Sequence, residues 1–521
     1  MRNYAENGNG NQVNDHMPFT GLEALVIAAE DADVEVAVAV PGYPITAIME
    51  NFFDRGTINA NWVTNEKVAL EIALGSSVVG MRSLVLTKHV GVNILSDTLI
   101  TSCTHTIGSG IVIIAGDDPG VVASQNEQDS RSYGFIVENA VYDPSTPQVL
   151  YESIHHAFNI SEKASMPVII RVTNRILQLS STIERVNTEK NSKLFDRNIW
   201  KLTMRGKHQR FHKVAYPLMK AESEITTLNM VINRGKSIGI ISSGYVSHVI
   251  ENDLKYCINQ KKISHLMLTM IFPLPKLHLD DFIKKHEYIL VIEETEPVIE
   301  SFLNSTGYKK ICGKNTGHLP YGLIEINDIE FAIENAHKYY VNNQITVQTI
   351  KERGSRSLCK KCPFIPLYNA LSHFDVPIAG DLGCSILTAP KPFELVDTGF
   401  SLGSSISVAM GFKRKGIAII GDFGLAHTGI IGLINATHIN SDVLIIVLQN
   451  EIAAMTGGQN VPDLTKIVKT IVKDTTIIET DKLSKSLLEE DIYNIVNSKL
   501  SHDGVSVLLV RGTCEKSYYL D

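Results

Sequence analysis

Two oxygen-donor side chains, Asp422 and Asn450, each follow an apolar run in the stretch IAIIGDFGLAHTGIIGLINATHINSDVLIIVLQN. Such runs predict β-strands, and open α/β sheets bind their ligands beyond the carboxyl ends of the strands. Carboxylate and amide oxygens suit Mg²⁺ or Ca²⁺ and do not favour zinc. The pair therefore predicts a site for a divalent cation, and it raises the question of what that cation carries.

The elements that would position these side chains follow an α/β rhythm. Apolar runs such as EVAVAV, SLVLTK, GIVIIAG and PVIIRVT alternate with helical patterns from residue 19 to about residue 173. Buried strands separated by helices predict parallel sheets with helices on both faces. A smaller pattern follows (SIGIISS, YILVIEE), and a third runs from SRSLCKKCPF to VSVLLVRGTC. We expect a disordered tail at 1–18, a first domain at 19–185, a linker at 186–232, a second domain at 233–350 and a third at 351–521.

The bulk composition excludes several classes of protein. A chain of 521 residues with 44% hydrophobic and 20% charged residues is typical of a multidomain globular protein. The net charge of -8 argues against a nucleic-acid binder, which would show a basic stripe. The Asn- and Gly-rich start is neither a signal nor a transit peptide, and no apolar run approaches the roughly 20 residues that a membrane span needs. Seven cysteines without a secretion signal indicate a cytoplasmic protein with free thiols or thiolate ligands.

Asp422 and Asn450 resemble the motif that binds the metal and the diphosphate in thiamine diphosphate (ThDP) enzymes. The resemblance implies that Asp422, Asn450 and the carbonyl oxygen of Ile452 hold Mg²⁺, which neutralises the diphosphate of the cofactor. Gly421 would let the backbone approach the phosphates closely. Phe423 departs from the motif, because many ThDP enzymes have a second glycine at that position.

A second carboxylate, Glu66, lies in the first expected domain, in WVTNEKVALEIALG. ThDP chemistry needs a carboxylate against the aminopyrimidine ring, and such a Glu normally begins a helix after a strand in a separate α/β unit. Glu66 fits that placement behind Asn65, which is expected to open the helix. The alternative is a capping acid that merely complements the N-terminus of the helix.

Longer stretches extend the resemblance over residues 19 to 514. The stretches NEKVALEIALGSSVVGMRSLVLTKHVGVNILSDTL, GDLGCSILTAPKPFELVDTGFSLGSSISVAMGF and NEIAAMTGGQN are similar to the large (α) subunits of the indolepyruvate ferredoxin oxidoreductase family. That family belongs to the 2-oxoacid:ferredoxin oxidoreductases. The resemblance implies two doubly wound ThDP-type domains, one for the pyrimidine and one for the diphosphate. They would flank a smaller α/β domain like the C-terminal domain of transketolase.

The same resemblance assigns roles to single residues. Glu66 would activate the aminopyrimidine, and Thr46 of GYPITA would meet the carboxylate or carbonyl group of the substrate. Arg131 would pair with the substrate carboxylate, or equally form an ion pair between domains. His427 would face the cofactor or cap a helix. The residues expected to line the reacting centre are Lys88, His89 and Asn93, and those expected to bind the cofactor also include Gly403 and Gly421.

Four cysteines fall in the third expected domain, at positions where the family carries the ligands of a [4Fe–4S] cluster. They are Cys359, Cys362, Cys384 and Cys514. The alternative is that these four thiols bind no metal, as we expect for Cys103, Cys257 and Cys312. Two departures affect the electron chemistry: Phe364 stands where the family usually has His, and we expect the chain to lack the family's C-terminal ferredoxin-like domain.

These inferences predict the oxidative decarboxylation of an arylpyruvate-like 2-oxoacid to an acyl-CoA, with electrons passed to ferredoxin. The resemblance also implies a smaller β subunit, a homodimer, or both. If electrons cannot leave, the expected alternative is a non-oxidative decarboxylase or carboligase. A protein of another class, a regulatory paralogue that binds ThDP without turnover, would be expected to lose Glu66, Asp422 and Asn450.

Overall fold

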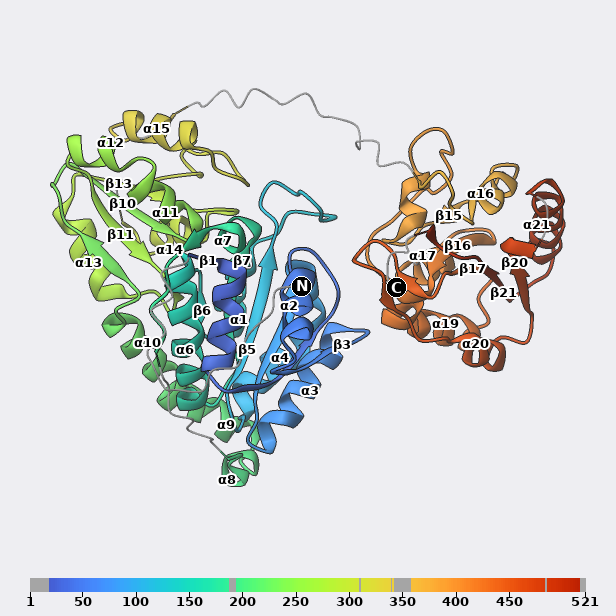
Figure 1. Cartoon of the computed structure of the whole chain (residues 1–521), viewed down its shortest axis with the longest axis horizontal. Helices are drawn as coiled ribbons and strands as arrows, with labels where there is room; N and C mark the ends of the chain where they lie inside the picture. The colour runs from blue at the N-terminus through green and yellow to red at the C-terminus, as the bar shows by residue number, and fades with distance from the viewer. Residues whose placement is uncertain are drawn as a thin grey trace, which may run out of the picture.

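Three α/β sheets follow one another along the chain (Figure 1). The structure is a computed structural model that describes residues 18–186, 194–308, 311–338, 340–341, 358–482 and 485–515. Residues 1–17 of the tail expected at 1–18, and the boundary expected near residue 350, lie outside these residues. The predicted α/β class with parallel sheets is confirmed.

The first sheet has seven strands in the order β12-β6-β7-β5-β4-β2-β3. All pairings are parallel except that of β12, which comes from the middle of the chain and pairs antiparallel with β6. The strands are β2 (Val34–Ala39), β3 (Asn59–Trp62), β4 (Arg82–Lys88), β5 (Ile111–Asp117), β6 (Val141–Tyr142), β7 (Val168–Thr173) and β12 (Met270–Phe272). The central strands β4, β5 and β7 are almost wholly buried, as expected for a sheet that is covered on both faces.

Helices cover both faces of the first sheet. α1 packs against α2, α6 and α7, while α3 and α4 pack together on the other face (Figure 1). The bounds are α1 (Gly21–Asp31), α2 (Thr46–Arg55), α3 (Glu66–Val78), α4 (His89–His105), η1 (Ser130–Ser132), α5 (Tyr133–Val137), α6 (Pro147–Ala164) and α7 (Asn174–Gln178). The strands β1 (Phe19–Thr20) and β8 (Ser180–Ser181), far apart in the sequence, pair antiparallel in a separate two-stranded sheet.

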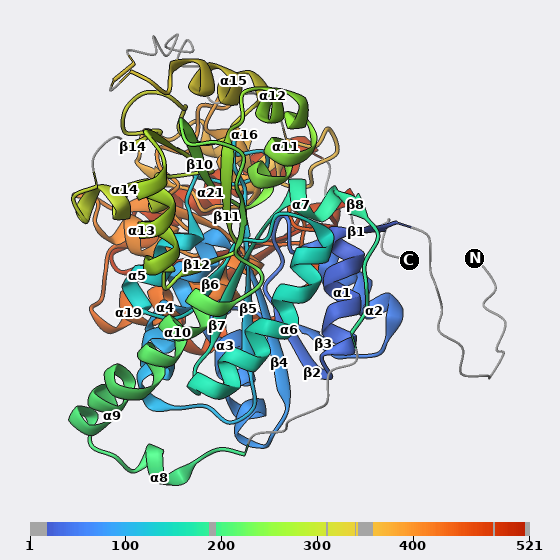
Figure 2. The same cartoon turned by 90° about the vertical axis from the view of Figure 1, so that its left-hand side faces the viewer.

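Much of the expected linker at 186–232 is helical. α9 packs against α4, and α10 packs against α6 and α13, so this segment bridges the first and second sheets (Figure 2). Its elements are α8 (Arg197–Trp200), α9 (Met204–Arg210), the π-helical turn η2 (Phe211–Ala215) and α10 (Tyr216–Ile225). The helices have a short apolar side that includes the buried Phe211 and Met219, but its few residues lie among many charged ones and give no clear helical pattern in the sequence.

The second sheet has five strands in the order β14-β13-β10-β11-β9, antiparallel only at β9. Its strands are β9 (Met230–Ile232), β10 (Ile238–Ser243), β11 (Ser264–Leu268), β13 (Tyr288–Ile292) and β14 (Ile311–Cys312). Its helices are α11 (Tyr245–Asn252), α12 (Lys255–Gln260), α13 (Lys276–Lys285), α14 (Val298–Ser305) and α15 (Ile326–Asn335).

The third sheet is parallel throughout, in the order β15-β16-β17-β21-β20. Its strands are β15 (Ile378–Ala379), β16 (Gly416–Gly421), β17 (Val443–Gln449), β20 (Thr475–Glu479) and β21 (Val505–Arg511), and a hairpin joins β18 (Ile452–Ala453) to β19 (Gln459–Asn460). The helical elements are α16 (Ile365–Leu371), η3 (Cys384–Thr388), α17 (Ser405–Met410), α18 (Asp422–Gly424), η4 (Leu425–Gly429), α19 (Ile430–His438), α20 (Thr465–Ile471), η5 (Thr480–Lys482) and α21 (Lys485–Leu500).

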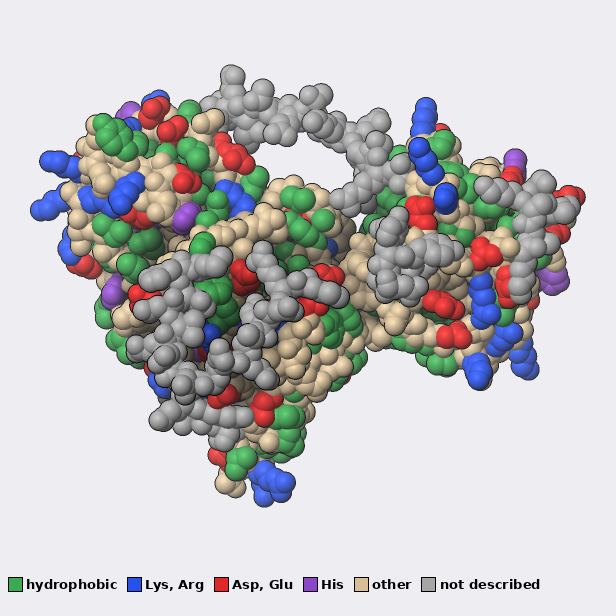
Figure 3. Space-filling model, in the orientation of Figure 1, with side chains coloured by type: hydrophobic (Ala, Val, Ile, Leu, Met, Phe, Trp, Pro, Cys, Tyr) green, Lys and Arg blue, Asp and Glu red, His purple; other side chains and the backbone are tan. Residues whose placement is uncertain are grey.

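The surface agrees with the composition. Acidic and basic side chains alternate over the described part of the face in Figure 3, without a continuous basic stripe. Within the described residues, every helix is too short or too polar to cross a bilayer.

Candidate active site

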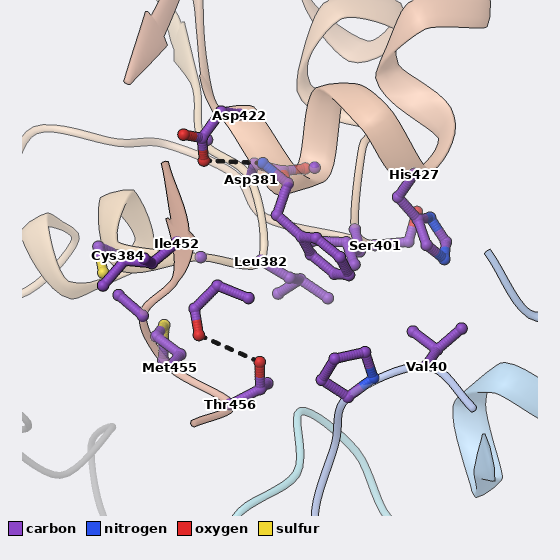
Figure 4. A pocket seen from close by; sticks show the side chains of 18 of the residues that line it. Val40, Asp381, Leu382, Cys384, Ser401, Asp422, His427, Ile452, Met455 and Thr456 are labelled. Carbon is purple, nitrogen blue, oxygen red and sulfur yellow. Dashed lines mark hydrogen bonds between the residues drawn. The ribbon is translucent and has the colours of Figure 1, made fainter. Parts of the chain in front are cut away.

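A cavity of about 200 Å³ lies between the first and third sheets. Val40, Glu66 and Lys88 come to it from the first sheet and its helices, and Asp422 and Asn450 come from the third sheet. Figure 4 shows His427 and Val40 toward one end of the cavity and Cys384 and Met455 toward the other. Both sheets therefore present the carboxyl ends of their strands to one space, which is the expected place for a ligand.

Glu66 is the first residue of α3 and is buried at the cavity wall. Asn65 precedes it as the predicted cap, and its side chain accepts a hydrogen bond from the backbone of Lys67 at 2.9 Å. The Oε2 atom of Glu66 lies 2.7 Å from Nε2 of His427, across the boundary between the first and third sheets. Capping is therefore supplied by Asn65, and the carboxylate of Glu66 is directed at the cavity and at His427.

Gly91 in α4 makes room for this carboxylate. A Cβ atom at Gly91 would lie 2.5 Å from Oε1 of Glu66 and 2.0 Å from Oγ1 of Thr87. Both distances are far below van der Waals contact, so only glycine lets α4 pass so close behind Glu66.

Asp422 begins α18 directly after β16, and Asn450 directly follows β17, as predicted. The Oδ2 atom of Asp422 accepts backbone hydrogen bonds from Asn450 at 3.0 Å and from Glu451 at 2.7 Å. Burial nevertheless raises the pKa of Asp422 to about 6. Ile452 begins β18 and lines the same cavity. The two polar side chains and the Ile452 backbone thus lie together at one edge of the third sheet.

The sequence analysis missed Asp381, which follows β15 and is only 1% exposed. Its Oδ1 atom accepts hydrogen bonds from the backbone of Gly403 at 2.7 Å and of Ser404 at 3.1 Å. Its Oδ2 atom is buried and has no hydrogen-bond partner, and burial raises the pKa of Asp381 to about 7. The signal was present, because Gly380-Asp381 after an apolar run repeats the pattern of Gly421-Asp422.

The two predicted glycines differ in their surroundings, and only Gly421 lines the cavity. Gly403 has a φ of +85°, and a Cβ atom there would lie 2.1 Å from Oγ1 of Thr428. A Cβ atom at Gly421, by contrast, would meet nothing within 4 Å. Gly403 thus permits a tight turn, whereas Gly421 leaves open space on the wall of the cavity.

Lys88 lines the cavity, and its Nζ atom donates a hydrogen bond to Gln125 at 3.3 Å. Burial lowers the pKa of Lys88, although the nearby carboxylates of Asp118 and Glu66 oppose that shift. Thr46 stands beside the cavity and donates from Oγ1 to the carbonyl oxygen of Thr456 at 3.2 Å. Both residues therefore lie where the first sheet meets the third.

Two residues expected at the reacting centre do not line the cavity. His89 is fully buried, and its Nε2 atom lies 3.2 Å from the backbone oxygen of Asn126. Asn93 forms a reciprocal pair of hydrogen bonds with Gln128 and accepts one from Tyr133 at 2.6 Å. Both side chains hold the loop that follows β5, which itself contributes Gln125 to the cavity.

Arg131 lies in an ion network between the first and second sheets, and not at the cavity. Its guanidinium contacts Asp129 at 2.6 Å and Glu293 at 3.0 Å, and it is wholly buried. Burial favours the neutral form of Asp129, but Arg131 and Arg171 outweigh it and hold the pKa of Asp129 below its ordinary value. Further pairs are Arg171–Asp117 at 2.7 Å, Arg171–Asp143 at 3.1 Å and Arg175–Glu294 at 2.6 Å. The geometry supports the ion pair between domains, because these contacts occupy the guanidinium that a substrate would need.

The four cysteines expected to hold a cluster come together at one end of the cavity. Burial raises the pKa of Cys362 to about 12, and the thiols of the other three, Cys384, Cys359 and Cys514, add to the rise. Cys384 and Phe364 also line the cavity. Within the described residues, no group of three His, Cys, Asp or Glu side chains is arranged to hold a metal ion. The thiols are thus gathered near one another without forming a closed ligand set.

The chain is similar in sequence to known proteins. Residues 381–487 match the family described as thiamine pyrophosphate enzyme, C-terminal TPP binding domain. The indolepyruvate oxidoreductase subunit IorA of Methanothermobacter thermautotrophicus is 31% identical over 483 residues, which cover 86% of this chain and 77% of that relative. The same subunit of Archaeoglobus fulgidus is 28% identical and covers 95% of this chain and 86% of the relative. Among solved structures, a 2-oxoglutarate:ferredoxin oxidoreductase from Magnetococcus marinus aligns with a TM-score of 0.45 at 14% identity, over 57% of this chain and 61% of that one.

Proposed function

Because this chain belongs to the family of indolepyruvate oxidoreductase IorA subunits, a family of ThDP-dependent 2-oxoacid oxidoreductases, we propose that it oxidatively decarboxylates an arylpyruvate-like 2-oxoacid. In the proposal coenzyme A accepts the acyl group, ferredoxin accepts the electrons, and a smaller β subunit assembles with this chain. A second copy of this chain completes the proposed assembly. We place the protein in the cytoplasm, whose reducing conditions suit thiols that serve as cluster ligands.

The residues of the cavity fit ThDP with Mg²⁺. Asp422, Asn450 and the carbonyl oxygen of Ile452 form an all-oxygen donor set, which is what Mg²⁺ requires, and these residues would hold the metal and the diphosphate. The open space at Gly421 lets phosphate oxygens approach the backbone. At the other wall, Glu66 places a carboxylate where the aminopyrimidine would bind. The unpartnered oxygen of Asp381 is a further sign that the protein alone does not satisfy this cavity.

When bound, ThDP supplies the nucleophilic carbon and the electron sink that decarboxylation of a 2-oxoacid requires. The protein contributes position, charge and a dry site. Glu66 holds or releases a proton at its carboxylate, which is fixed between α4 and His427. Lys88 is the cation that the first sheet brings to the cavity wall, so it would meet the substrate carboxylate in place of Arg131.

The gathered cysteines support the oxidative form of the reaction. Four thiolates are the ordinary ligands of a [4Fe–4S] cluster, and Cys359, Cys362, Cys384 and Cys514 would hold it. Since Cys384 itself lines the cavity, the cluster would lie next to the reacting centre and would carry electrons toward ferredoxin.

One observation carries the proposal: Glu66 and Asp422, from two different sheets, line a single cavity. The test is anaerobic purification with iron and Mg²⁺, followed by calorimetric titration with ThDP. We expect saturable, Mg²⁺-dependent binding, a visible iron–sulfur absorption, and reduction of ferredoxin when an arylpyruvate and coenzyme A are added with the β subunit. A colourless protein that releases CO₂ and a free aldehyde would support the non-oxidative alternative. A protein with no affinity for ThDP would overturn the proposal altogether.

A further inference from the structure

The hydrogen bond between Glu66 and His427 joins residues from opposite sides of the cavity. The Nε2 atom of His427 lies 2.7 Å from Oε2 of Glu66, and each residue is only 6% exposed. Asn65 fixes the backbone of the same histidine, because its side-chain amide donates to the His427 carbonyl oxygen at 3.2 Å. The adjacent residues Asn65 and Glu66, at the start of α3, thus both form hydrogen bonds with His427.

The other ring nitrogen of His427 indicates where the protons lie. The hydroxyl of Thr428 donates its proton to the Leu402 carbonyl oxygen at 2.7 Å. Its oxygen therefore presents lone pairs to Nδ1 of His427, 3.4 Å away, which favours a proton on Nδ1. With Nδ1 protonated, the bond between Nε2 and Oε2 needs one further proton. That proton belongs either to an imidazolium facing a carboxylate or to a carboxylic acid facing a neutral imidazole.

The remaining oxygen of Glu66 is left for a ligand. Oε1 has no hydrogen-bond partner among the described residues, and α4 stands behind it at Gly91. Rotation of the carboxylate is therefore blocked on one side by α4 and restrained on the other by His427. The charged or titratable groups acting on this pair are Lys88, which faces Glu66, and Asp381, which faces His427.

We propose that His427 is a positioning residue for Glu66: it holds Oε2 and shares one proton with it, so that Oε1 meets the cavity ligand in a fixed orientation. The inference rests on the proposed function, in which Glu66 acts on the aminopyrimidine. It explains why the two sides of the cavity are joined at this carboxylate.

Two variants separate orientation from proton sharing. His427→Ala removes both, while His427→Gln can still donate an N–H to Oε2 but cannot exchange a proton. We expect His427→Ala to lower kcat by roughly 100-fold with little change in KM, because a small misplacement of a catalytic group has effects of that size. His427→Gln should recover part of kcat and lose the acid limb of the pH–rate profile.

A readout independent of turnover is the number of protons exchanged when ThDP and Mg²⁺ bind, measured by calorimetry in two buffers of different ionisation enthalpy. We expect this number, followed against pH, to differ between the wild type and His427→Gln. His265→Gln is the matched control, since His265 is buried and lies 2.7 Å from Glu251 in the second sheet, away from the cavity. It should lower stability and leave the proton count unchanged.

Each outcome decides the matter. If His427→Ala and His427→Gln keep the wild-type pH profile and proton count and lose only thermal stability, His427 is merely structural and the inference fails. If His427→Gln does not fold, Thr428→Val carries the same test, because it removes the oxygen facing Nδ1 and leaves the histidine in place. If the wild type itself does not bind ThDP, the proposed function fails first and the inference fails with it.

Discussion

The first sheet meets the second sheet and the third sheet through charged residues near the carboxyl ends of its strands, but the two interfaces differ. Toward the second sheet the charges are solidly paired: Arg131 and Arg171 contact acidic side chains from both sheets or from the intervening loops. Toward the third sheet the polar groups surround a cavity, and Oδ2 of Asp381 is buried without a partner.

The pairing of buried charges distinguishes an interface that is only structural from one that forms a binding site. Burying a charge is expensive unless it is paired and hydrogen-bonded, so fully paired charges already have their compensation within the protein. A buried group that remains unpaired, such as Oδ2 of Asp381, needs an explanation, and a ligand bound in the cavity would supply one. The four predictions below test this comparison.

The largest effect is expected at the cavity. Glu66→Gln should lower turnover by about 10² to 10⁴-fold, the range associated with a general acid or base, while leaving ThDP affinity largely intact. Steady-state kinetics and calorimetry would measure the two quantities. Glu71→Gln on the same helix is the control, because Glu71 only forms an exposed pair with Lys67. Turnover that survives in Glu66→Gln would contradict the assigned role.

At the interface between the first and second sheets we expect a loss of stability. Arg131→Ala should lower the free energy of unfolding by about 3–5 kcal/mol, because it leaves Asp129 and Glu293 buried without their cation. Chemical denaturation of the apo-protein measures this change. Arg55→Ala, which breaks the partly exposed pair with Glu30, should cost at most about 1 kcal/mol. If the Arg131→Ala protein is as stable as the wild type but has a raised KM, Arg131 binds the substrate carboxylate and the ion pair between domains is not its role.

A methyl group at Gly91 probes the space behind Glu66. Gly91→Ala should destabilise the protein by about 1–3 kcal/mol and reduce turnover, because its Cβ would press on Thr87 and Glu66. Gly75→Ala in α3 is the control, since a Cβ there meets nothing within 4 Å. That substitution should be neutral or stabilising by about 0.5–1 kcal/mol, as expected for alanine in a helix. Equal effects at the two glycines would contradict the close packing at Gly91.

The last prediction concerns how the stability of the apo-protein depends on pH. The folded pKa of Asp381 is raised from 3.8 to about 7, so this group favours the folded state at low pH. That contribution is lost as the pH rises toward 7 and Asp381 ionises in the fold. Asp381→Asn should therefore match the wild type near pH 4 and become relatively more stable above pH 7, in thermal melts of the apo-protein.

A carboxylate with the opposite shift serves as the control. Burial favours the neutral form of Asp474, but hydrogen bonds from Lys499 and Ser506 and the charge of Lys499 together outweigh it and hold the pKa of Asp474 below its ordinary value. Asp474 therefore stabilises the fold at neutral pH, and Asp474→Asn should be less stable than the wild type there. A pH-independent difference between Asp381→Asn and the wild type would contradict the buried, unpaired state of Asp381.

Local patterns were sufficient for most strands, whereas the roles of the two principal carboxylates also needed the family resemblance. The runs at β2, β4, β5, β7, β10, β13 and β21 predict buried strands because burial on both faces leaves a continuous apolar signature. Glu66 and Asp422 were found because each directly follows a recognisable element boundary. The helices of the expected linker were missed, since their apolar positions are few and lie among dense charges.

The sequence by itself determined the α/β architecture, the family likeness and the residues that end the strands, because these depend on neighbours along the chain. Only the tertiary structure decided which of those residues meet. Arg131 is separated from Glu293, and Glu66 from His427, by long stretches of chain, and no local pattern encodes such contacts. The energy of a buried charge depends on what surrounds it in space, so identical residue types became a rigid ion network in one place and a binding cavity in the other.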